Sequence, residues 1–346
     1  MFKRIATVAV ILMISLSILS FWAYRSVLAL PQTQLSVTED TVFVIPKGYS
    51  ASHLASELST RGWLDDPIRL KLLFRLRPEL THLKAGEYNV TAGLTLRELL
   101  QQLREGRSVQ YKVTLIEGSS VKEMLSYLKD NQQLEHTLSS NDAIELAKEL
   151  GIDRYTTSEG LFLAETYFFE KGTTDRELLL RAASSLDKAL ASQWLDRAPD
   201  TPLTSPYEAL ILASIIEKET GLAKERPMIS AVFVRRLNKG MRLQTDPTVI
   251  YGLGDQYKGN ITRQHLKQST PYNTYRIDGL PPSPISIVGL DAIKAALNPA
   301  SGTALYFVAK GDGSHQFSDT LKQHNRAVRE YQLKRRSDYR STPEKK

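Results

Sequence analysis

The chain has 346 residues, of which 42% are hydrophobic and 24% charged, and its formal net charge is +7. These fractions are typical of a globular protein and too apolar for a disordered one, and the length allows about two domains. The sequence contains no cysteine, which excludes disulfides, thiolate metal sites and cysteine nucleophiles. The basic residues form no stripe interleaved with aromatics, so nucleic acid is not an expected partner.

Residues 5–24 form an uncharged apolar segment. As a helix rising about 1.5 Å per residue, this segment spans the roughly 30 Å of a hydrocarbon core. The preceding Lys3 and Arg4 favour a cytoplasmic N-terminus. A cleavable signal peptide is the alternative, since Val27 and Ala29 are small enough for a cleavage site, but the apolar segment is longer than the roughly 7–15 residues of a signal-peptide core. We expect a single-pass anchor in the inner (cytoplasmic) membrane with a periplasmic or extracytoplasmic body.

The pattern predicts a cytoplasmic stub at 1–4, a linker at 25–40 and a small α/β module at 41–108. Strands are indicated by alternating β-branched residues, and helices by caps and terminal glycines. The predicted elements are a strand at 41–45, a helix from Ser50 to Gly62, a helix at 67–76, a strand at 86–90 and a helix from Thr95 to Gly106.

A larger, mostly helical domain is expected at 109–336, followed by a disordered tail at 337–346. Residues 240–287 are rich in Pro, Gly, Tyr, Asn and Thr, and a loop tract this long in a compact domain is usually functional. The overall fold class is α+β. The predicted elements are a strand at 109–116, a helix opened by 118–120, helices near 140–150, 174–195, 205–220, 224–238 and 289–297, a hairpin of 305–309 with 315–317, and a final helix from about 319.

One predicted helix is apolar on every side and ends in acidic residues. Residues 205–208 have capping-box spacing with proline at the first helical position, and residues 209–216 are apolar all round, which indicates burial. A glutamate in the last turn is disfavoured as an anion by burial and by the helix C-terminus, so its pKa should rise, as a general acid requires. The other interpretation is that Glu217 and Glu219 are both solvated.

Several separated motifs then follow in fixed order. The segments are 213–220 (ASIIEKET), 242–252 (RLQTDPTVIYG), 269–275 (STPYNTY), 279–282 (GLPP), 307–315 (FVAKGDGSH) and 324–325 (HN). Together they resemble the endolytic murein transglycosylases of the MltG (YceG-like) family, from the anchor to about residue 335. One departure is that 162–165 reads Phe-Leu-Ala-Glu where the family pattern has proline before the acidic residue.

The resemblance implies a membrane-anchored lytic transglycosylase, a carbon–oxygen lyase, with no cofactor expected. None of the six histidines has zincin-type spacing, so no catalytic metal is expected either. Its fold would combine one membrane span, a LysM-like module at 41–108 and a catalytic domain distantly similar to lysozyme-type enzymes. The family's catalytic glutamate falls on Glu217, with Glu219 as a solvated neighbour. The implied reaction cleaves the β-1,4 bond between N-acetylmuramic acid and N-acetylglucosamine inside nascent peptidoglycan strands, leaves 1,6-anhydro ends and terminates strand elongation. The resemblance also suggests peptidoglycan synthases as partners.

Amide and aromatic side chains suit sugar hydroxyls, acetamido groups and pyranose faces, although each of them could instead order a loop. A hydrolase on the same bond stays open and would need Asp246 or Glu165 as a base to activate water. A glycan-binding scaffold without catalysis also stays open. The residues expected to line the glycan groove are Gln244, Thr245, Asp246, Tyr251, Asn273 and Tyr275.

Overall fold

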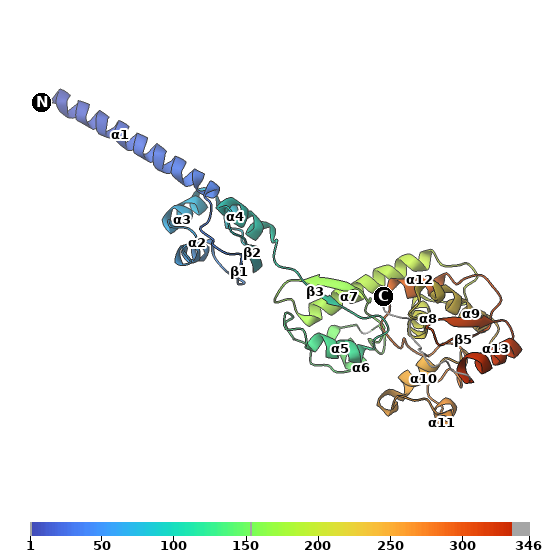
Figure 1. The fold of residues 1–346 in the computed structure, drawn as a ribbon. Helices are drawn as coiled ribbons and strands as arrows, with labels where there is room; N and C mark the ends of the chain where they lie inside the picture. Colours follow the sequence, from blue (N-terminus) through green and yellow to red (C-terminus); the bar gives the residue numbers. More distant parts are fainter. Residues whose placement is uncertain (1, 153, 334–346) are drawn as a thin grey trace. The chain divides into compact units, whose positions relative to one another are not determined.

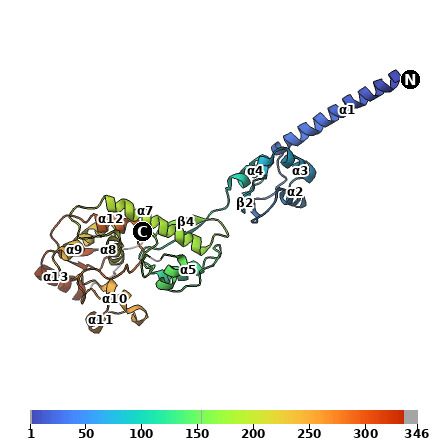
Figure 2. The same cartoon turned by 180° about the vertical axis from the view of Figure 1, so that it is seen from behind.

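The computed structural model describes residues 2–152 and 154–333, so the predicted tail at 337–346 lies outside the described residues. The chain divides into two compact units (Figure 1, Figure 2). Of the described residues, 2–111 and 168–172 belong to the N-terminal unit, and 112–152, 154–167 and 173–333 belong to the C-terminal unit. Each unit mixes helices with a small amount of strand, which gives the α+β class expected from the sequence.

The N-terminal unit begins with a long apolar helix, α1 (Phe2–Ala29). Among the described residues, one helix is long and apolar enough to cross a membrane, and its most apolar window is fully exposed with a mean hydropathy of 2.3. The end of this helix has a different environment. Val27, and Leu30 in the 3-10 helix η1 (Leu30–Gln32), are buried in the core of the N-terminal unit. The apolar helix therefore continues directly into the folded module.

The folded module of this unit contains a two-stranded antiparallel sheet covered by three helices. The strands β1 and β2 pair with Thr41 opposite Val90, and Phe43 and Tyr88 of these strands are fully buried. The predicted strands and helices between 41 and 106 are confirmed. Each of the three helices begins at a side-chain cap, which fixes its start locally. The elements are β1 (Thr41–Ile45), α2 (Ala51–Thr60), α3 (Pro67–Leu76), η2 (Pro78–Thr81), β2 (Gly86–Val90) and α4 (Leu96–Glu105).

The C-terminal unit is built around α8, which packs against α7, α9, α10 and α12. Figure 2 shows α8 among these helices. The predicted helices and hairpin of this region are confirmed, whereas β3 is shorter than the expected strand at 109–116 and β4 was not foreseen. The elements from Tyr111 onward, apart from those at 240–287, are β3 (Tyr111–Thr114), α5 (Val121–Lys129), α6 (Ala143–Leu150), β4 (Thr166–Phe169), α7 (Asp175–Leu195), α8 (Pro206–Glu219), η3 (Ala223–Glu225), α9 (Arg226–Asn238), α12 (Leu290–Leu297), β5 (Tyr306–Ala309), β6 (His315–Ser318), α13 (Leu321–Val328) and the π-helical turn η5 (Arg329–Leu333).

The tract at 240–287 is not the continuous loop that its composition predicted. It contains α10 (Asp246–Leu253), the 3-10 helix η4 (Gly254–Gln256) and α11 (Arg263–Lys267). Pro247 occupies the first turn of α10, a position where a missing N–H costs no helical hydrogen bond. Packing against α8 stabilises this short helix, and such tertiary stabilisation leaves only a weak pattern in the sequence.

Candidate active site

The end of α8 carries the two candidate glutamates. At the start of this helix the Ser205 hydroxyl accepts a hydrogen bond from the Glu208 amide at 3.2 Å, while the Glu208 carboxylate accepts one from the Thr204 amide at 2.6 Å. That acceptor contact lies one residue before the position a capping box uses. Residues 209–216 are buried as predicted, and Glu217, for which a solvated position was the other interpretation, is buried as well. The helix ends at Glu219, so its last turn brings both carboxyl groups to the edge of the core.

Glu217 lies in a buried ion pair. Its Oε1 accepts a hydrogen bond from Nη2 of Arg226 at 2.6 Å, and its Oε2 accepts one from the amide of Gly289 at 3.1 Å. The two charged side chains are only 3% and 8% exposed. Nη2 of Arg226 also lies 2.9 Å from the Glu117 carboxylate. Burial raises the pKa of Glu217, and the positive charge of Arg226 acts against that rise.

Glu219 leaves α8 on the opposite side and has a different environment. It was expected to be solvated, but the residue is half-buried and its carboxylate accepts a hydrogen bond from the hydroxyl of Thr245. Burial raises the pKa of Glu219 to about 7, the Thr245 hydrogen bond opposes the rise, and the negative charge of Asp246 adds to it. Within the described chain, no cation contributes to this pKa. The correction follows from α10, which covers this side of α8.

Hydroxyl groups join the two motif segments next to Glu219. The Thr274 hydroxyl accepts a hydrogen bond from the Thr245 amide at 3.0 Å and lies 2.8 Å from the Thr248 hydroxyl. The phenol of Tyr275 donates to Oδ1 of Asp246 at 2.7 Å. Three of the six residues predicted for the groove, Thr245, Asp246 and Tyr275, thus meet beside Glu219, although they are separated by up to 30 positions in the sequence.

Gln244 and Asn273 differ in how firmly their side chains are held. Gln244 has a φ of 51°, the one positive φ of a non-glycine residue among those the structure describes, and its side-chain oxygen lies 3.4 Å from Nη1 of Arg236. The buried amide of Asn273 donates to three backbone carbonyls, with the shortest distance, 2.6 Å, to Gln268. The Asn273 side chain therefore orders the loop backbone, whereas the Gln244 side chain is exposed and its place in the glycan groove stays a prediction.

Tyr251 lies over a second buried carboxyl group. Its hydroxyl donates to Oε2 of Glu159 at 3.2 Å, and Oε1 of Glu159 accepts a hydrogen bond from the amide of Val121 at 3.0 Å. The ring of Tyr251 packs edge-on against Tyr272, with centroids 4.8 Å apart. Burial raises the pKa of Glu159 to about 7. Glu165, the other candidate base, is exposed.

The sequence did not reveal the partners of these carboxylates. Arg226 and Glu117 lie in different segments from Glu217, and only folding brings them within hydrogen-bond distance. Gly289 was the one partner that the sequence could have suggested, because a glycine allows another group to come close to the backbone. A Cβ atom at this position would lie 2.0 Å from Oε1 of Glu117.

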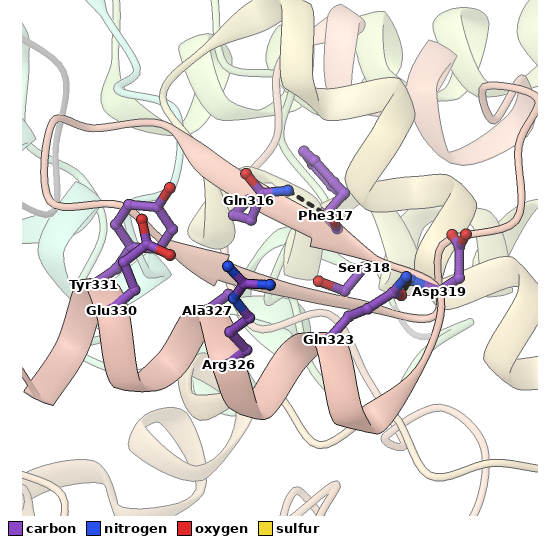
Figure 3. Close-up of a pocket in the computed structure, with 9 residues that line it drawn as sticks. All are labelled: Gln316, Phe317, Ser318, Asp319, Gln323, Arg326, Ala327, Glu330 and Tyr331. Carbon is purple, nitrogen blue, oxygen red and sulfur yellow. Dashed lines mark hydrogen bonds between the residues drawn. The ribbon is translucent and has the colours of Figure 1, made fainter.

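Metal-binding groups and pockets were also sought in the described chain. No group of three or more His, Asp or Glu side chains among residues 2–152 and 154–333 is placed to hold a metal ion. A polar pocket of about 300 Å³ lies between β6 and α13, with Arg326, Gln323 and Asp319 among its lining residues (Figure 3). None of the residues predicted for the glycan groove lines it.

The YceG-like family model matches residues 43–330, which include every candidate residue described above. The chain belongs to the YceG-like family. Among curated relatives, the endolytic murein transglycosylase of Bacillus subtilis is 30% identical over 306 residues and is matched over 83% of both chains. The endolytic murein transglycosylase of Streptococcus pneumoniae is 25% identical over 319 residues, which cover 83% of this chain and 57% of that protein.

A solved structure supports the same assignment to the YceG-like family. The crystal structure of a putative yceG-like protein from Listeria monocytogenes is 28% identical to this chain and aligns with a TM-score of 0.50. The alignment covers 84% of this chain and 99% of the Listeria chain. The family match therefore extends over both units of the fold.

Proposed function

We propose that this protein is a membrane-anchored endolytic lytic transglycosylase of peptidoglycan. Membership of the YceG-like family and the curated relatives named endolytic murein transglycosylases support the reaction class. The observation that carries the proposal furthest is the environment of Glu219, a carboxyl group with a pKa raised to about 7, surrounded by residues of two family-like motifs. A carboxyl group of that pKa is protonated often enough near neutral pH to serve as a general acid.

The contacts favour Glu219 over Glu217 as that acid. The sequence predicted Glu217 as the acid. Its Oε1, however, is paired with Arg226 at 2.6 Å, and this pairing stabilises the ionised form of Glu217. Protonation of Glu217 would also weaken the ion pair of a buried guanidinium. Glu219 has no cationic partner in the described chain. We assign the proton-donating role to Glu219 and a positioning role at the helix end to the Glu217–Arg226 pair.

The proposed reaction then proceeds with one carboxyl group. Protonated Glu219 donates its proton to the glycosidic oxygen, and the bond between this oxygen and C1 of N-acetylmuramic acid breaks. The acetamido group of that sugar stabilises the positive charge at C1, as in substrate-assisted glycosidases. The ionised Glu219 then removes the proton from the C6 hydroxyl, whose oxygen bonds to C1 and closes the 1,6-anhydro ring. The enzyme is regenerated without water.

Asp246 and Tyr275 are proposed to keep Glu219 protonated, and Tyr251 is proposed to contact the substrate. The negative charge of Asp246 raises the pKa of Glu219, so it favours the protonated state that starts the reaction. The phenol of Tyr275 fixes Asp246 through a 2.7 Å hydrogen bond. The aromatic ring of Tyr251, which is fixed by Glu159 and Tyr272, is proposed to contact the face of a sugar.

The remaining parts of the chain are proposed to place this site at the cell wall. The apolar helix α1 is consistent with a membrane anchor, and Lys3 and Arg4 favour a cytoplasmic N-terminus and a periplasmic body. The module at 41–108 is proposed to be LysM-like, and the C-terminal unit to be distantly lysozyme-like. Terminating nascent strands beside peptidoglycan synthases would fit an enzyme held at the membrane surface.

The products formed from purified peptidoglycan separate the candidate functions. The full chain in detergent would be incubated with the polymer, and the soluble fragments analysed by mass spectrometry. Internal fragments with 1,6-anhydro-muramoyl ends are expected. Reducing ends would instead establish a hydrolase and direct attention to Asp246, and the absence of any product would favour a glycan-binding scaffold.

A further inference from the structure

The helix α3 exposes an apolar stripe to its surroundings. Ile68, Leu72 and Leu76 are 76%, 43% and 41% exposed. Their spacing of four residues places them on one face of the helix, while Leu70 and Leu73 point into the core. Three large apolar side chains in a row on an exposed face indicate a surface that meets another apolar phase.

Basic residues border this stripe on both sides. In helical projection Lys71 and Arg75 lie along one border and Arg69 lies along the other. The first two are exposed, and Arg69 is partly exposed. An apolar stripe between basic residues is typical of helices that lie in the headgroup region of a membrane.

The position of α3 next to α1 decides which partner this surface has. Nη1 of Arg69 donates a hydrogen bond to the Ser26 hydroxyl near the end of α1 at 2.9 Å, and α1 and α3 pack against each other within the N-terminal unit (Figure 1). Trp22 and Tyr24, about one turn earlier, are exposed, and such aromatic residues mark the membrane–water interface. The stripe therefore lies beside the end of the apolar span.

A cavity with arginine side chains opens at the same end of α1. It has a volume of about 460 Å³ and lies between the end of α1, the segment after α3, and α4. Arg97 and Arg104 of α4 line it together with Arg77, and Leu28 contributes to its apolar wall. Within the described chain, Arg77 pairs with Glu79 at 3.5 Å, whereas neither Arg97 nor Arg104 forms an ion pair.

We propose that the N-terminal unit binds the membrane surface through α3 and holds the phosphate of an anionic phospholipid in the arginine cavity. The inference rests on the proposed anchoring by α1. The Ile68–Leu72–Leu76 stripe enters the headgroup region, and Arg97 and Arg104 bind the lipid phosphate, because guanidinium groups bind phosphate through paired hydrogen bonds. The partner of the stripe and of the cavity is the membrane leaflet at which α1 ends, because both lie beside that end of the helix.

Site-specific fluorescent labels test where the stripe lies. The chain has no cysteine, so the single variants Leu72→Cys, Val44→Cys and Leu16→Cys each give one labelling position in the full chain. Val44, on β1, is 50% exposed and serves as the matched control, and Leu16, inside α1, reports the anchor. In nanodiscs containing nitroxide-labelled lipids, we expect quenching of the labels at 16 and 72 and not at 44.

The three labels also separate this inference from the proposed function. Quenching at 16 without quenching at 72 would overturn the membrane-bound α3 and leave the anchor intact. Absence of quenching at 16 would remove the anchor and the inference with it. Protection of position 72 by glycan fragments in place of lipid would assign the stripe to the polymer and overturn the proposal. None of these readouts depends on the formation of anhydro products.

The lipid that stays bound tests the cavity. The full chain would be purified from mixed phosphatidylglycerol and phosphatidylcholine, and the retained lipids would be quantified by mass spectrometry. We expect at least a fivefold preference for the anionic lipid, and its loss in Arg97→Gln/Arg104→Gln. Arg61→Gln/Arg107→Gln removes the same charge from residues outside the cavity and should keep the preference. Equal loss in both double variants, or in neither, would contradict a site in the cavity.

Discussion

Arg226 and Glu217 form a buried ion pair in which Nη2 and Oε1 are 2.6 Å apart, and the same guanidinium reaches Glu117 on its other side. This pair ties the start of α9 to the end of α8, two residues before Glu219. It explains how a charged group can exist inside an apolar helix cluster, because each buried charge has a partner.

Removing Arg226 should destabilise the protein strongly. Arg226→Ala leaves the carboxylate of Glu217 buried without its cation, which typically costs about 3–5 kcal/mol of unfolding free energy. Thermal or denaturant unfolding of the full chain in detergent measures the change. The control is Lys122→Ala, which breaks an exposed ion pair with Asp255 and should cost less than about 1 kcal/mol. Equal effects of the two variants would contradict a buried structural pair.

The hydroxyl of Thr245 should set the pH range of activity. It donates to the carboxylate of Glu219 and so lowers the pKa of that group. Removing the donor in Thr245→Val should therefore raise the pKa of Glu219 further. If Glu219 must be protonated, activity declines as the pH rises through this pKa. The alkaline limb of the pH–rate profile should therefore move to higher pH in Thr245→Val and stay near its original position in Thr245→Ser. A shift to lower pH would contradict this assignment.

Glu159 should make the folded state less stable at neutral pH than at pH 5. Its pKa is raised from the ordinary value of 4.5 to about 7 in the folded protein, so the folded state holds a proton that the unfolded chain releases between these values. The contribution of Glu159 to stability is therefore greatest below about pH 4.5 and is lost as the pH rises through 7, which amounts to about 3 kcal/mol.

Unfolding of wild type and Glu159→Gln at pH 5, 6, 7 and 8 measures this contribution. The glutamine side chain of the variant cannot ionise, so the fall in stability over this range should be smaller than in wild type. Glu219 contributes in the same direction, and a residual decline in Glu159→Gln is expected for that reason. Identical pH dependence in both proteins would show that Glu159 is ionised throughout.

Gly160 should tolerate no side chain. It has a φ of +76°, and a Cβ atom there would lie 2.4 Å from Cβ of Pro284. Gly160→Ala combines backbone strain with a steric clash, and we expect a loss of more than about 2 kcal/mol. Gly151 has a similar φ of +71° with no neighbouring atom within 4 Å, so Gly151→Ala isolates the backbone cost. Equal melting temperatures for the two variants would contradict the close approach of Pro284.

The sequence predicted those parts of the fold that local signals determine. The first strand and α3 match their predicted bounds because β-branched alternation and the prolines Pro67 and Pro78 at the two ends of the helix are local features. The helix α10 was missed because its stability comes from packing against α8. The burial of Glu219 was missed for the same reason. It depends on α10, and local periodicity could not predict where α10 packs.

The candidate site shows the same division. Motif order placed Thr245, Asp246 and Tyr275 in one functional group, and their side chains do meet beside α8. The distinction between Glu217 and Glu219 could not come from helical periodicity, because both lie in the last turn of a buried helix. It depends on Arg226, which lies on the next helix, and on the Thr245 hydroxyl, which lies 26 residues further along the chain.

In the proposed reaction, Glu219 donates the proton to the glycosidic oxygen, and two matched variants test this role directly. Glu219→Gln and Glu217→Gln, each checked for folding by its melting temperature, would be compared with wild type for the rate of 1,6-anhydro end formation from peptidoglycan. We expect Glu219→Gln to lose at least a thousandfold in rate while keeping its fold, and a folded Glu217→Gln to retain measurable activity. Full activity in Glu219→Gln, with complete loss in a folded Glu217→Gln, would contradict this assignment and return the acid to Glu217.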